Sequence, residues 1–301
     1  MKPSRRTFIK RGGITLAGAA LFSNKIFGAQ HSDDHILGIQ LYSVRDDMEK
    51  DPAGTLKQLA AAGYTHVEHA GYENGNFYGY TPLEFKNLLK DLRLTMLSGH
   101  SGLDAGKWNK AKNDFTGEWK QTISDAAAVG MQYVISPGLD ESLCKNEEDF
   151  KWYIQLHNKT GELCKKAGIH FAFHNESYEF DHYFNKVRLY DILLNSTDTS
   201  LVAQQIDIGN MYAPGGRAMD YLKRYPGRFI SMHVKDVIKS DAKEGYENAT
   251  LGKGVVGVKE VVEFARKTGT KHFIIEQESY QGKPPMACAK EDLDIMKSWG
   301  F

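Results

Sequence analysis

Cysteine is scarce in this sequence, and neither sign of charge is in excess. The three cysteines, Cys144, Cys164 and Cys288, are widely spaced and form no Cys-x-x-Cys pair, so they predict no disulfide framework. Lysine and arginine together number 38, as do aspartate and glutamate, and the formal net charge is zero. Proteins that bind nucleic acid non-specifically need a basic face to displace counterions. We therefore expect no nucleic-acid partner.

Long hydrophobic runs are also lacking, so we expect no stable membrane span. The N-terminus differs from the rest of the chain: Arg5 and Arg6 form a twin arginine, a Gly/Ala-rich stretch comes next, and a small-residue site ends at Ala29. This pattern resembles a bacterial twin-arginine signal peptide over residues 1–29. The resemblance implies export by the twin-arginine machinery and a periplasmic location. The alternative is a basic N-terminus on a cytoplasmic enzyme.

The remaining chain alternates between short apolar runs and helical patterns. Strands are expected to begin near residues 36, 65, 94, 131, 169, 201, 229 and 272. Helices are expected over residues 52–62, 81–92, 115–129, 147–167, 186–195, 219–225, 258–268 and 290–299. Eight such repeats predict an α/β protein, a single-domain (β/α)8 TIM barrel over residues 30–301. A doubly wound sheet is the alternative, but the first strand, ending QLYSVRDD, lacks the glycine-rich turn of that fold.

Polar residues gather where the later strands end, which in a TIM barrel is the active-site face. The fifth to eighth strands end FHNESYEF, QIDIGN, SMHVKD and IIEQES. Each of these ends supplies a Glu, an Asp or a His to the same rim. Such an oxygen-rich set with one imidazole suits one divalent metal ion: Mn²⁺, Mg²⁺, Co²⁺ or Zn²⁺.

The order of motifs carries a family resemblance. HVEHAGY, SGH, FAFHNESYEF, QIDIGN, SMHVKD, LGKGVVGVKE and FIIEQES resemble the xylose isomerase-like TIM-barrel superfamily, and within it the sugar phosphate isomerase/epimerase group. The resemblance implies a divalent metal held by Glu179, Asp207, His233 and Glu276, with Glu179 and Glu276 also acting as the catalytic proton-transfer bases. His174 matches the first position of a frequent His-Asn-His signature. The second histidine is replaced by Glu176, which is the alternative to Glu179 as the residue that faces the metal.

This residue set predicts a metal-dependent sugar isomerase or epimerase. A carboxylate removes the proton next to the carbonyl of a sugar or keto-sugar, and the metal stabilises the resulting enediolate. The substrate-binding residues are expected to be His100, His174, Lys235 and Asn210. His69 alternates away from Glu68 and is expected at the surface or at a cap.

Other functions remain open at this stage. If the intermediate expels a substituent, the same site is a 3-keto-glycoside lyase or hydratase. A non-catalytic sugar-binding barrel is a further alternative, because fold does not fix function. A DNA-repair endonuclease needs more histidine ligands and a basic face. The sugar, the metal and the oligomeric state, a homo-oligomer included, are not determined by the sequence.

Overall fold

The computed structural model describes residues 35–242 and 244–301. The predicted signal peptide, residues 1–29, lies outside the described residues. No helix within the described ranges combines the length and the apolar character needed to cross a bilayer.

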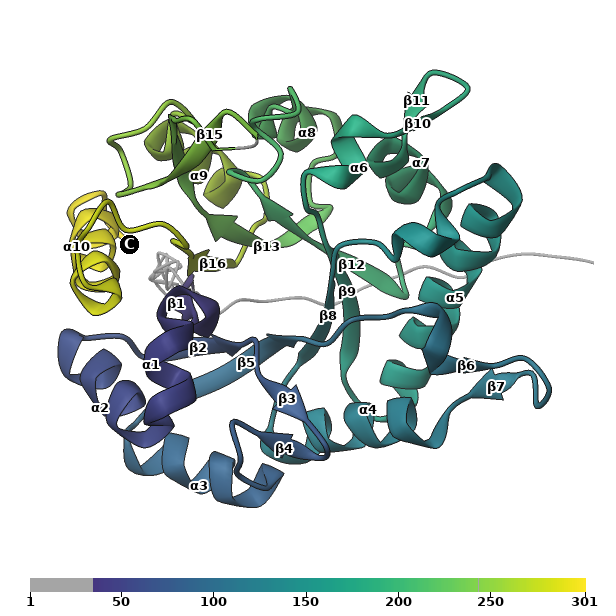
Figure 1. The fold of residues 1–301 in the computed structure, drawn as a ribbon, viewed down its shortest axis with the longest axis horizontal. Helices are drawn as coiled ribbons and strands as arrows, with labels where there is room; N and C mark the ends of the chain where they lie inside the picture. Colours follow the sequence, from purple (N-terminus) through teal and green to yellow (C-terminus); the bar gives the residue numbers. More distant parts are fainter. Residues whose placement is uncertain (1–34, 243) are drawn as a thin grey trace, which may run out of the picture. The chain divides into compact units, whose positions relative to one another are not determined.

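Eight parallel strands close into a barrel (Figure 1), in the order β1-β16-β13-β12-β9-β8-β5-β2. This confirms the predicted TIM barrel. Their bounds are β1 Ile36–Gln40, β2 His66–His69, β5 Thr95–His100, β8 Tyr133–Pro137, β9 His170–His174, β12 Val202–Asp207, β13 Phe229–Val234 and β16 His272–Ile275. The barrel closes where β1 pairs with β16, Ile36 lying opposite His272.

Helices surround the barrel, and most follow the predicted positions. The helices are α1 Arg45–Lys50, α2 Pro52–Ala62, α3 Pro82–Asp91, α4 Gly117–Val129, α5 Glu147–Lys166, α6 Tyr178–Asp181, α7 Leu189–Ser196, α8 Ala218–Arg224, α9 Val258–Lys267 and α10 Pro285–Ser298. Two short helices, α1 and α6, were not expected. Helix α7 begins three residues later than expected because Val187–Arg188 (β11) pairs with Tyr183–Phe184 (β10).

Local sequence signals explain several helix ends. Thr81 and Glu84 form the reciprocal capping box of α3. Helices α2 and α4 end at Gly63 and Gly130, with φ of 104° and 106°, a left-handed conformation that glycine adopts without a steric penalty. Helix α10 begins at Pro285, earlier than expected, because proline is tolerated in a first helical turn.

Three further two-stranded hairpins lie at the carboxyl ends of barrel strands. These are β3–β4 (Tyr72–Glu73 with Asn76–Phe77), β6–β7 (Trp108–Asn109 with Asp114–Phe115) and β14–β15 (Asp236–Lys239 with Tyr246–Ala249). Side chains alternate along each barrel strand. In β2, Val67 and His69 therefore face the outer layer, whereas Glu68 faces the barrel axis and meets polar residues of other strands.

Candidate active site

Three potential metal ligands converge at the carboxyl end of the barrel. Asp207 ends β12, His233 lies in β13 and Glu276 directly follows β16. Their ligand atoms all lie within 4.8 Å of one another, and all three residues are buried. His233 Nδ1 lies 2.9 Å from Glu276 Oε2 and 3.7 Å from Asp207 Oδ2.

The chemistry of these three groups fits a divalent cation. Asp207 Oδ1 accepts hydrogen bonds from the backbone amides of Gly209 and Asn210, at 2.8 and 2.7 Å. The other oxygen, Oδ2, is buried, and the Lys235 ammonium 3.1 Å away is the charge partner that its burial requires. Two carboxylates and one imidazole nitrogen form a donor set that Mg²⁺, Mn²⁺ or Zn²⁺ can share.

Lys235 supplies positive charge at the same place. Its Nζ lies 3.1 Å from Asp207 Oδ2, 2.6 Å from Glu276 Oε2 and 2.6 Å from Glu278 Oε1. Burial alone would lower the pKa of Lys235, but the carboxylates of Asp207, Glu276 and Glu278 outweigh it and hold that pKa well above its ordinary value. The ammonium therefore stays charged and partly neutralises the carboxylates.

Glu68 is the central residue that the sequence interpretation did not assign to the site. Its carboxylate is fully buried. It accepts hydrogen bonds from Gln40 and Gln205 at 2.9 Å, and from the Ser98 hydroxyl. His233 Nε2 lies 2.6 Å from Glu68 Oε1. This contact turns His233 Nδ1 toward the other ligands, because a metal-binding histidine is oriented by the partner of its second nitrogen.

The pKa values of this pair reflect their mutual contact. Burial would raise the pKa of Glu68, but His233 and His100 outweigh it and hold the pKa well below its ordinary value. Burial would lower the pKa of His233, yet Glu276 and Glu68 raise it well above its ordinary value. In the absence of a metal, both groups are therefore ionised at neutral pH.

Gln205 organises the other two histidines. Its Oε1 lies 3.0 Å from His100 Nε2 and 2.9 Å from His174 Nδ1. Its Nε2 donates to Glu68 and to the Ser231 hydroxyl, which fixes the direction of the amide. The carbonyl oxygen can only accept, so His100 Nε2 and His174 Nδ1 donate to it. The second nitrogen of each ring, His100 Nδ1 and His174 Nε2, therefore points away from Gln205.

The structure does not bring Glu179 into the predicted ligand group. Glu179 lies in α6, beyond the end of β9. Its Oε1 accepts from the Leu139 amide at 2.9 Å and its Oε2 from the Glu176 amide at 2.7 Å. Both oxygens therefore already bind backbone amides. Burial raises the pKa of Glu179 to about 8.

Glu176, the alternative to Glu179, lines the cavity instead. Its Oε1 lies 3.6 Å from His174 Nε2, and its Oε2 accepts from Asn210 Nδ2 at 2.6 Å. Asn210 Oδ1 in turn accepts from Lys235 Nζ at 3.0 Å. Asn210 thus links the residue on the cavity wall to the charged cluster.

His69 was expected at the surface, and this expectation was wrong. The residue is fully buried, and its ring meets Phe77 edge-on at 5.0 Å. The β3–β4 hairpin carries Phe77, so this hairpin covers the outer face of β2. Burial lowers the pKa of His69 to about 3, so the ring is neutral.

The Asp236 carboxylate holds a glycine-rich loop in place rather than facing the site. Its Oδ1 accepts from the amides of Val237 and Val256, and its Oδ2 accepts from those of Gly252 and Gly254, at 2.9–3.1 Å. The glycine-rich segment LGKGVVG is therefore folded around one carboxylate. Lys235 and Asp236 point in opposite directions, as alternation requires.

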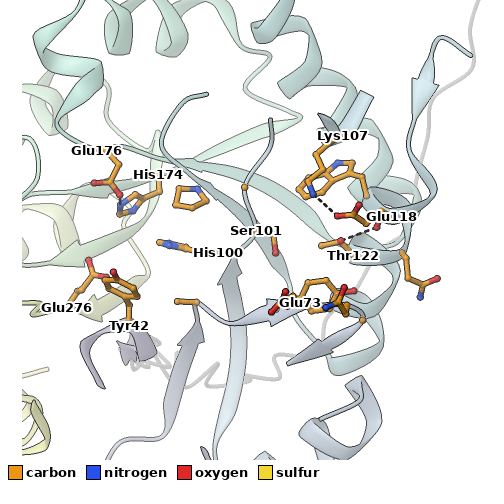
Figure 2. Close-up of a pocket in the computed structure, with 18 of the residues that line it drawn as sticks. Tyr42, Glu73, His100, Ser101, Lys107, Glu118, Thr122, His174, Glu176 and Glu276 are labelled. Atoms are coloured by element: carbon orange, nitrogen blue, oxygen red, sulfur yellow. Dashed lines mark hydrogen bonds and ion pairs between the residues drawn. The ribbon is translucent and has the colours of Figure 1, made fainter. Parts of the chain in front are cut away.

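A cavity of about 960 Å³ opens above the cluster. Figure 2 shows His100, His174, Glu176 and Glu276 at one end of it, together with Tyr42. The predicted substrate contacts His100 and His174 thus line a cavity next to the ligand group. Lys235 and Asn210 lie behind this wall and reach it through Glu278 and Glu176.

Curated relatives of the chain share one name. Inosose dehydratase of Clostridium perfringens is 29% identical over 109 residues, which cover 36% of this chain and 36% of that protein. Inosose dehydratase of Clostridium beijerinckii is 25% identical over 182 residues, covering 57% and 59%. The chain thus matches less than two thirds of the length of either relative.

Solved structures share the fold. A sugar phosphate isomerase/epimerase from Parabacteroides distasonis has a TM-score of 0.73 at 24% identity, covering 87% of this chain and 98% of that one. A 3-keto-D-glucoside 4-epimerase from E. coli has a TM-score of 0.64 at 12% identity, covering 88% and 99%. A xylose isomerase-like TIM barrel protein from Mycobacterium smegmatis, in complex with magnesium, has a TM-score of 0.63 at 16% identity, covering 88% and 96%.

The family match covers most of the barrel. The pattern of the xylose isomerase-like TIM barrel family extends over residues 56–299, from within α2 to the end of α10. Seven of the eight barrel strands, all except β1, lie within this segment, as do the converging Asp207, His233 and Glu276. The chain belongs to the xylose isomerase-like TIM barrel family.

Proposed function

We propose that this protein is a divalent-metal-dependent sugar isomerase or epimerase that removes a proton next to the carbonyl of a keto-sugar. One observation carries the proposal: Asp207, His233 and Glu276 converge beside a cavity, with their ligand atoms within 4.8 Å of one another. The 3-keto-D-glucoside 4-epimerase of E. coli, a sugar-modifying enzyme, has a similar fold. The magnesium complex of the M. smegmatis barrel supports a metal in this fold.

Asp207, His233 and Glu276 would hold the metal. A divalent ion bound there supplies charge that polarises a carbonyl and stabilises the negative oxygen formed when a neighbouring proton leaves. His100 adds a hydrogen-bonding group that lines the cavity, and Lys235 adds positive charge behind the cavity wall. Glu276 lines the cavity and lies within reach of a bound sugar, so we assign it the removal of the proton.

A second carboxylate is needed to return the proton. We assign this role to Glu176, because it lines the same end of the cavity as Glu276 (Figure 2), whereas both oxygens of Glu179 bind backbone amides. Glu179 then acts as a positioning residue that holds the backbone of Glu176. If the proton returns to the same carbon on the opposite face, the product is an epimer. If it returns to the neighbouring carbon, an aldose–ketose isomer forms.

Elimination is the second candidate. The curated relatives are inosose dehydratases, and dehydration begins with the same proton removal. The pair of electrons left by the C–H bond then forms a double bond and expels a hydroxyl or alkoxy group from the next carbon, and an acid protonates the departing oxygen to give water or an alcohol. The two candidates therefore share their first step and differ in the second.

Metal content and isotope exchange together test the proposal. Elemental analysis of the purified protein is expected to give about one divalent ion per chain, lost in Asp207→Ala and His233→Ala. Incubation with keto-sugars in D₂O is expected to incorporate deuterium, and Glu276→Gln should abolish this. Epimer formation supports the isomerase, and release of water or an aglycone supports elimination. Absence of metal after supplementation, or exchange that is unaffected in Glu276→Gln, contradicts the proposed chemistry.

We also propose that residues 1–29 direct export to the periplasm, on the support of the Arg5-Arg6 pair and the small-residue site ending at Ala29. Replacing both arginines by lysine should leave the full-length protein in the cytoplasm, whereas the unaltered chain should appear shortened in the periplasmic fraction. Equal distribution of the two proteins would contradict export by this route.

A further inference from the structure

The cavity extends well beyond the predicted metal ligands. Figure 2 shows Glu276, His174 and Tyr42 at one end, Lys107, Glu118 and Thr122 at the other, and Ser101 between them. The far end is built by the β3–β4 hairpin, the segment around Lys107 and the first turns of α4. Cavities of about 300 to 1,000 Å³ usually hold drug-sized ligands, so 960 Å³ exceeds what a single sugar ring needs.

Charge at the cavity wall disfavours a phosphorylated sugar. The lining includes five carboxylates: Glu73, Glu118, Glu176, Glu276 and Glu278. Lys107 is the only lysine or arginine among the described residues that line it, and its Nζ is paired with Glu118 at 2.8 Å. A phosphate at the far end would meet like charge without a free cation. The occupant of the far end therefore carries no phosphate.

The far end offers hydrogen-bonding groups of the kind that bind hydroxyls. Gln121 Nε2 donates to Asp125 at 2.8 Å, which directs the amide and leaves its carbonyl oxygen without a donor among the described residues. Trp119 lines this end and is 1% exposed, and its indole N–H lacks an acceptor in the part of the chain that the structure describes. This N–H is itself buried, so Trp119 offers a bound ring an apolar contact rather than a hydrogen bond.

We infer that the far end is a binding subsite for a second, unphosphorylated sugar ring, so that the substrate is a glycoside such as a disaccharide rather than a free sugar or a sugar phosphate. The inference rests on the proposed function for the identity of the reacting ring. The glycosidic bond would pass Ser101 and Gly102, and the second ring would lie against Lys107, Trp119 and Gln121. Glu118 is largely exposed, so this ring lies at the mouth of the cavity.

Gly102 permits a test that does not disturb the fold. A Cβ added there would meet no heavy atom within 4 Å, and its backbone is not left-handed. Gly102→Leu therefore places a side chain between the two ends of the cavity. Gly117→Leu is a matched control, because a Cβ at Gly117 also meets nothing within 4 Å and this residue does not line the cavity.

The measurement is the dissociation constant of glucose, cellobiose, maltose and trehalose, determined by ligand-observed NMR on the full-length protein. None of these sugars carries the ketone, so binding is independent of turnover. At least one disaccharide should bind about tenfold more tightly than glucose, as one or two added hydrogen bonds allow. That ratio should fall close to one in Gly102→Leu, decrease in Lys107→Ala and stay unchanged in Gly117→Leu.

Two results would overturn the subsite: no disaccharide exceeds glucose in affinity, or the ratio is the same in Gly102→Leu as in the unaltered protein. Failure of the proposed chemistry is recognised separately. Absence of deuterium exchange with 3-keto-glucose and 3-keto-cellobiose, combined with a disaccharide preference that Gly102→Leu removes, would retain the subsite and reject the isomerase.

Discussion

Glu68 and Gln205 are hydrogen-bonded to each other, and together they orient the rings of three histidines in the site. Glu68 accepts from His233, and Gln205 accepts from His100 and His174. Because each contact uses one defined ring nitrogen, the opposite nitrogen is presented to the cavity or to the ligand group. Glu68 and Gln205 thereby fix which ring nitrogen of each histidine faces the cavity or the ligand group.

We predict that Glu68→Gln weakens metal binding about tenfold to 100-fold, the range seen when the partner of a metal-bound histidine is altered. The amide can still accept from His233 Nε2, but it lacks the charge that increases the basicity of the ring. Isothermal titration with Mn²⁺ measures the effect. Ser98→Ala is the control, since it removes one partner of Glu68 without touching a histidine. Equal affinity in Glu68→Gln and Ser98→Ala would contradict this role.

Lys235 is a resident cation among the carboxylates. It has no solvent exposure and contacts Asp207, Glu276 and Glu278. A metal ion bound by Asp207 and Glu276 would add positive charge beside it. The side chain therefore stabilises the metal-free protein and opposes metal binding at the same time.

Lys235→Met is expected to lower the free energy of unfolding by about 3 to 5 kcal/mol in the presence of EDTA, because it leaves buried carboxylates unpaired. Added Mn²⁺ should restore most of this loss and should bind more tightly than to the unaltered protein. Denaturant unfolding with and without metal measures both effects. Lys253→Met, at an exposed pair with Glu291, should cost less than about 1 kcal/mol. If Lys235→Met loses the same free energy of unfolding with and without Mn²⁺, Lys235 and the metal do not compete for the carboxylates.

At the scale of elements, most of the fold could be predicted from the alternation of apolar runs with helical patterns and from helix-capping residues. The eight strands and the bounds of α2 follow from apolar runs, proline at the helix start and glycine at its end. Glu179 was misplaced because β9 ends at His174 and a helical turn follows at Tyr178–Asp181. The period of two applies only while a strand continues. Glu68 escaped assignment because its partners come from four other strands, and no local pattern links them.

The Asp236 carboxylate is the anchor of an element, the segment between β15 and α9. Asp236→Asn can accept at only one oxygen, so two of the four amide contacts are lost. Hydrogen exchange of residues 250–256 should accelerate by about tenfold or more, as expected for a loss of 1 to 3 kcal/mol in local stability. Ser240→Ala, in the same hairpin, should leave these amides unchanged. Acceleration of both variants alike would indicate general loosening of the hairpin.

At the scale of the whole molecule, the barrel closes between its first and last strands, and α10 covers this closure beside α2. Asp292 lies in α10, fully buried. Its Oδ1 accepts from the Leu251 amide at 2.9 Å, and its Oδ2 lacks a partner among the described residues. Burial raises the pKa of Asp292 from 3.8 to about 7. The neutral carboxylic acid is therefore the form that the folded protein favours.

The stability of the whole protein should consequently depend on pH through Asp292. Between about pH 4 and pH 7 the folded side chain retains a proton that the unfolded chain has released, so the contribution declines by about 1.4 kcal/mol per pH unit. Asp292→Asn lacks this decline. The free energy of unfolding of the variant, relative to that of the unaltered protein, should therefore rise from about pH 4 to pH 7 and stay constant above pH 7. Urea unfolding at pH 5, 6, 7 and 8 measures this difference. Asp294→Asn, exposed on the same helix, should show no such trend.

The three cysteines have a consequence for experiments on the folded chain. All are free and buried, and burial raises the pKa of Cys144 to about 12 and also raises that of Cys164. Thiolates are the reactive form, so alkylating reagents should reach these side chains only when the surrounding structure opens. Cys144 lies just before α5, Cys164 near the end of α5 and Cys288 in α10. The modification rate of each cysteine would therefore measure how often its own part of the structure opens.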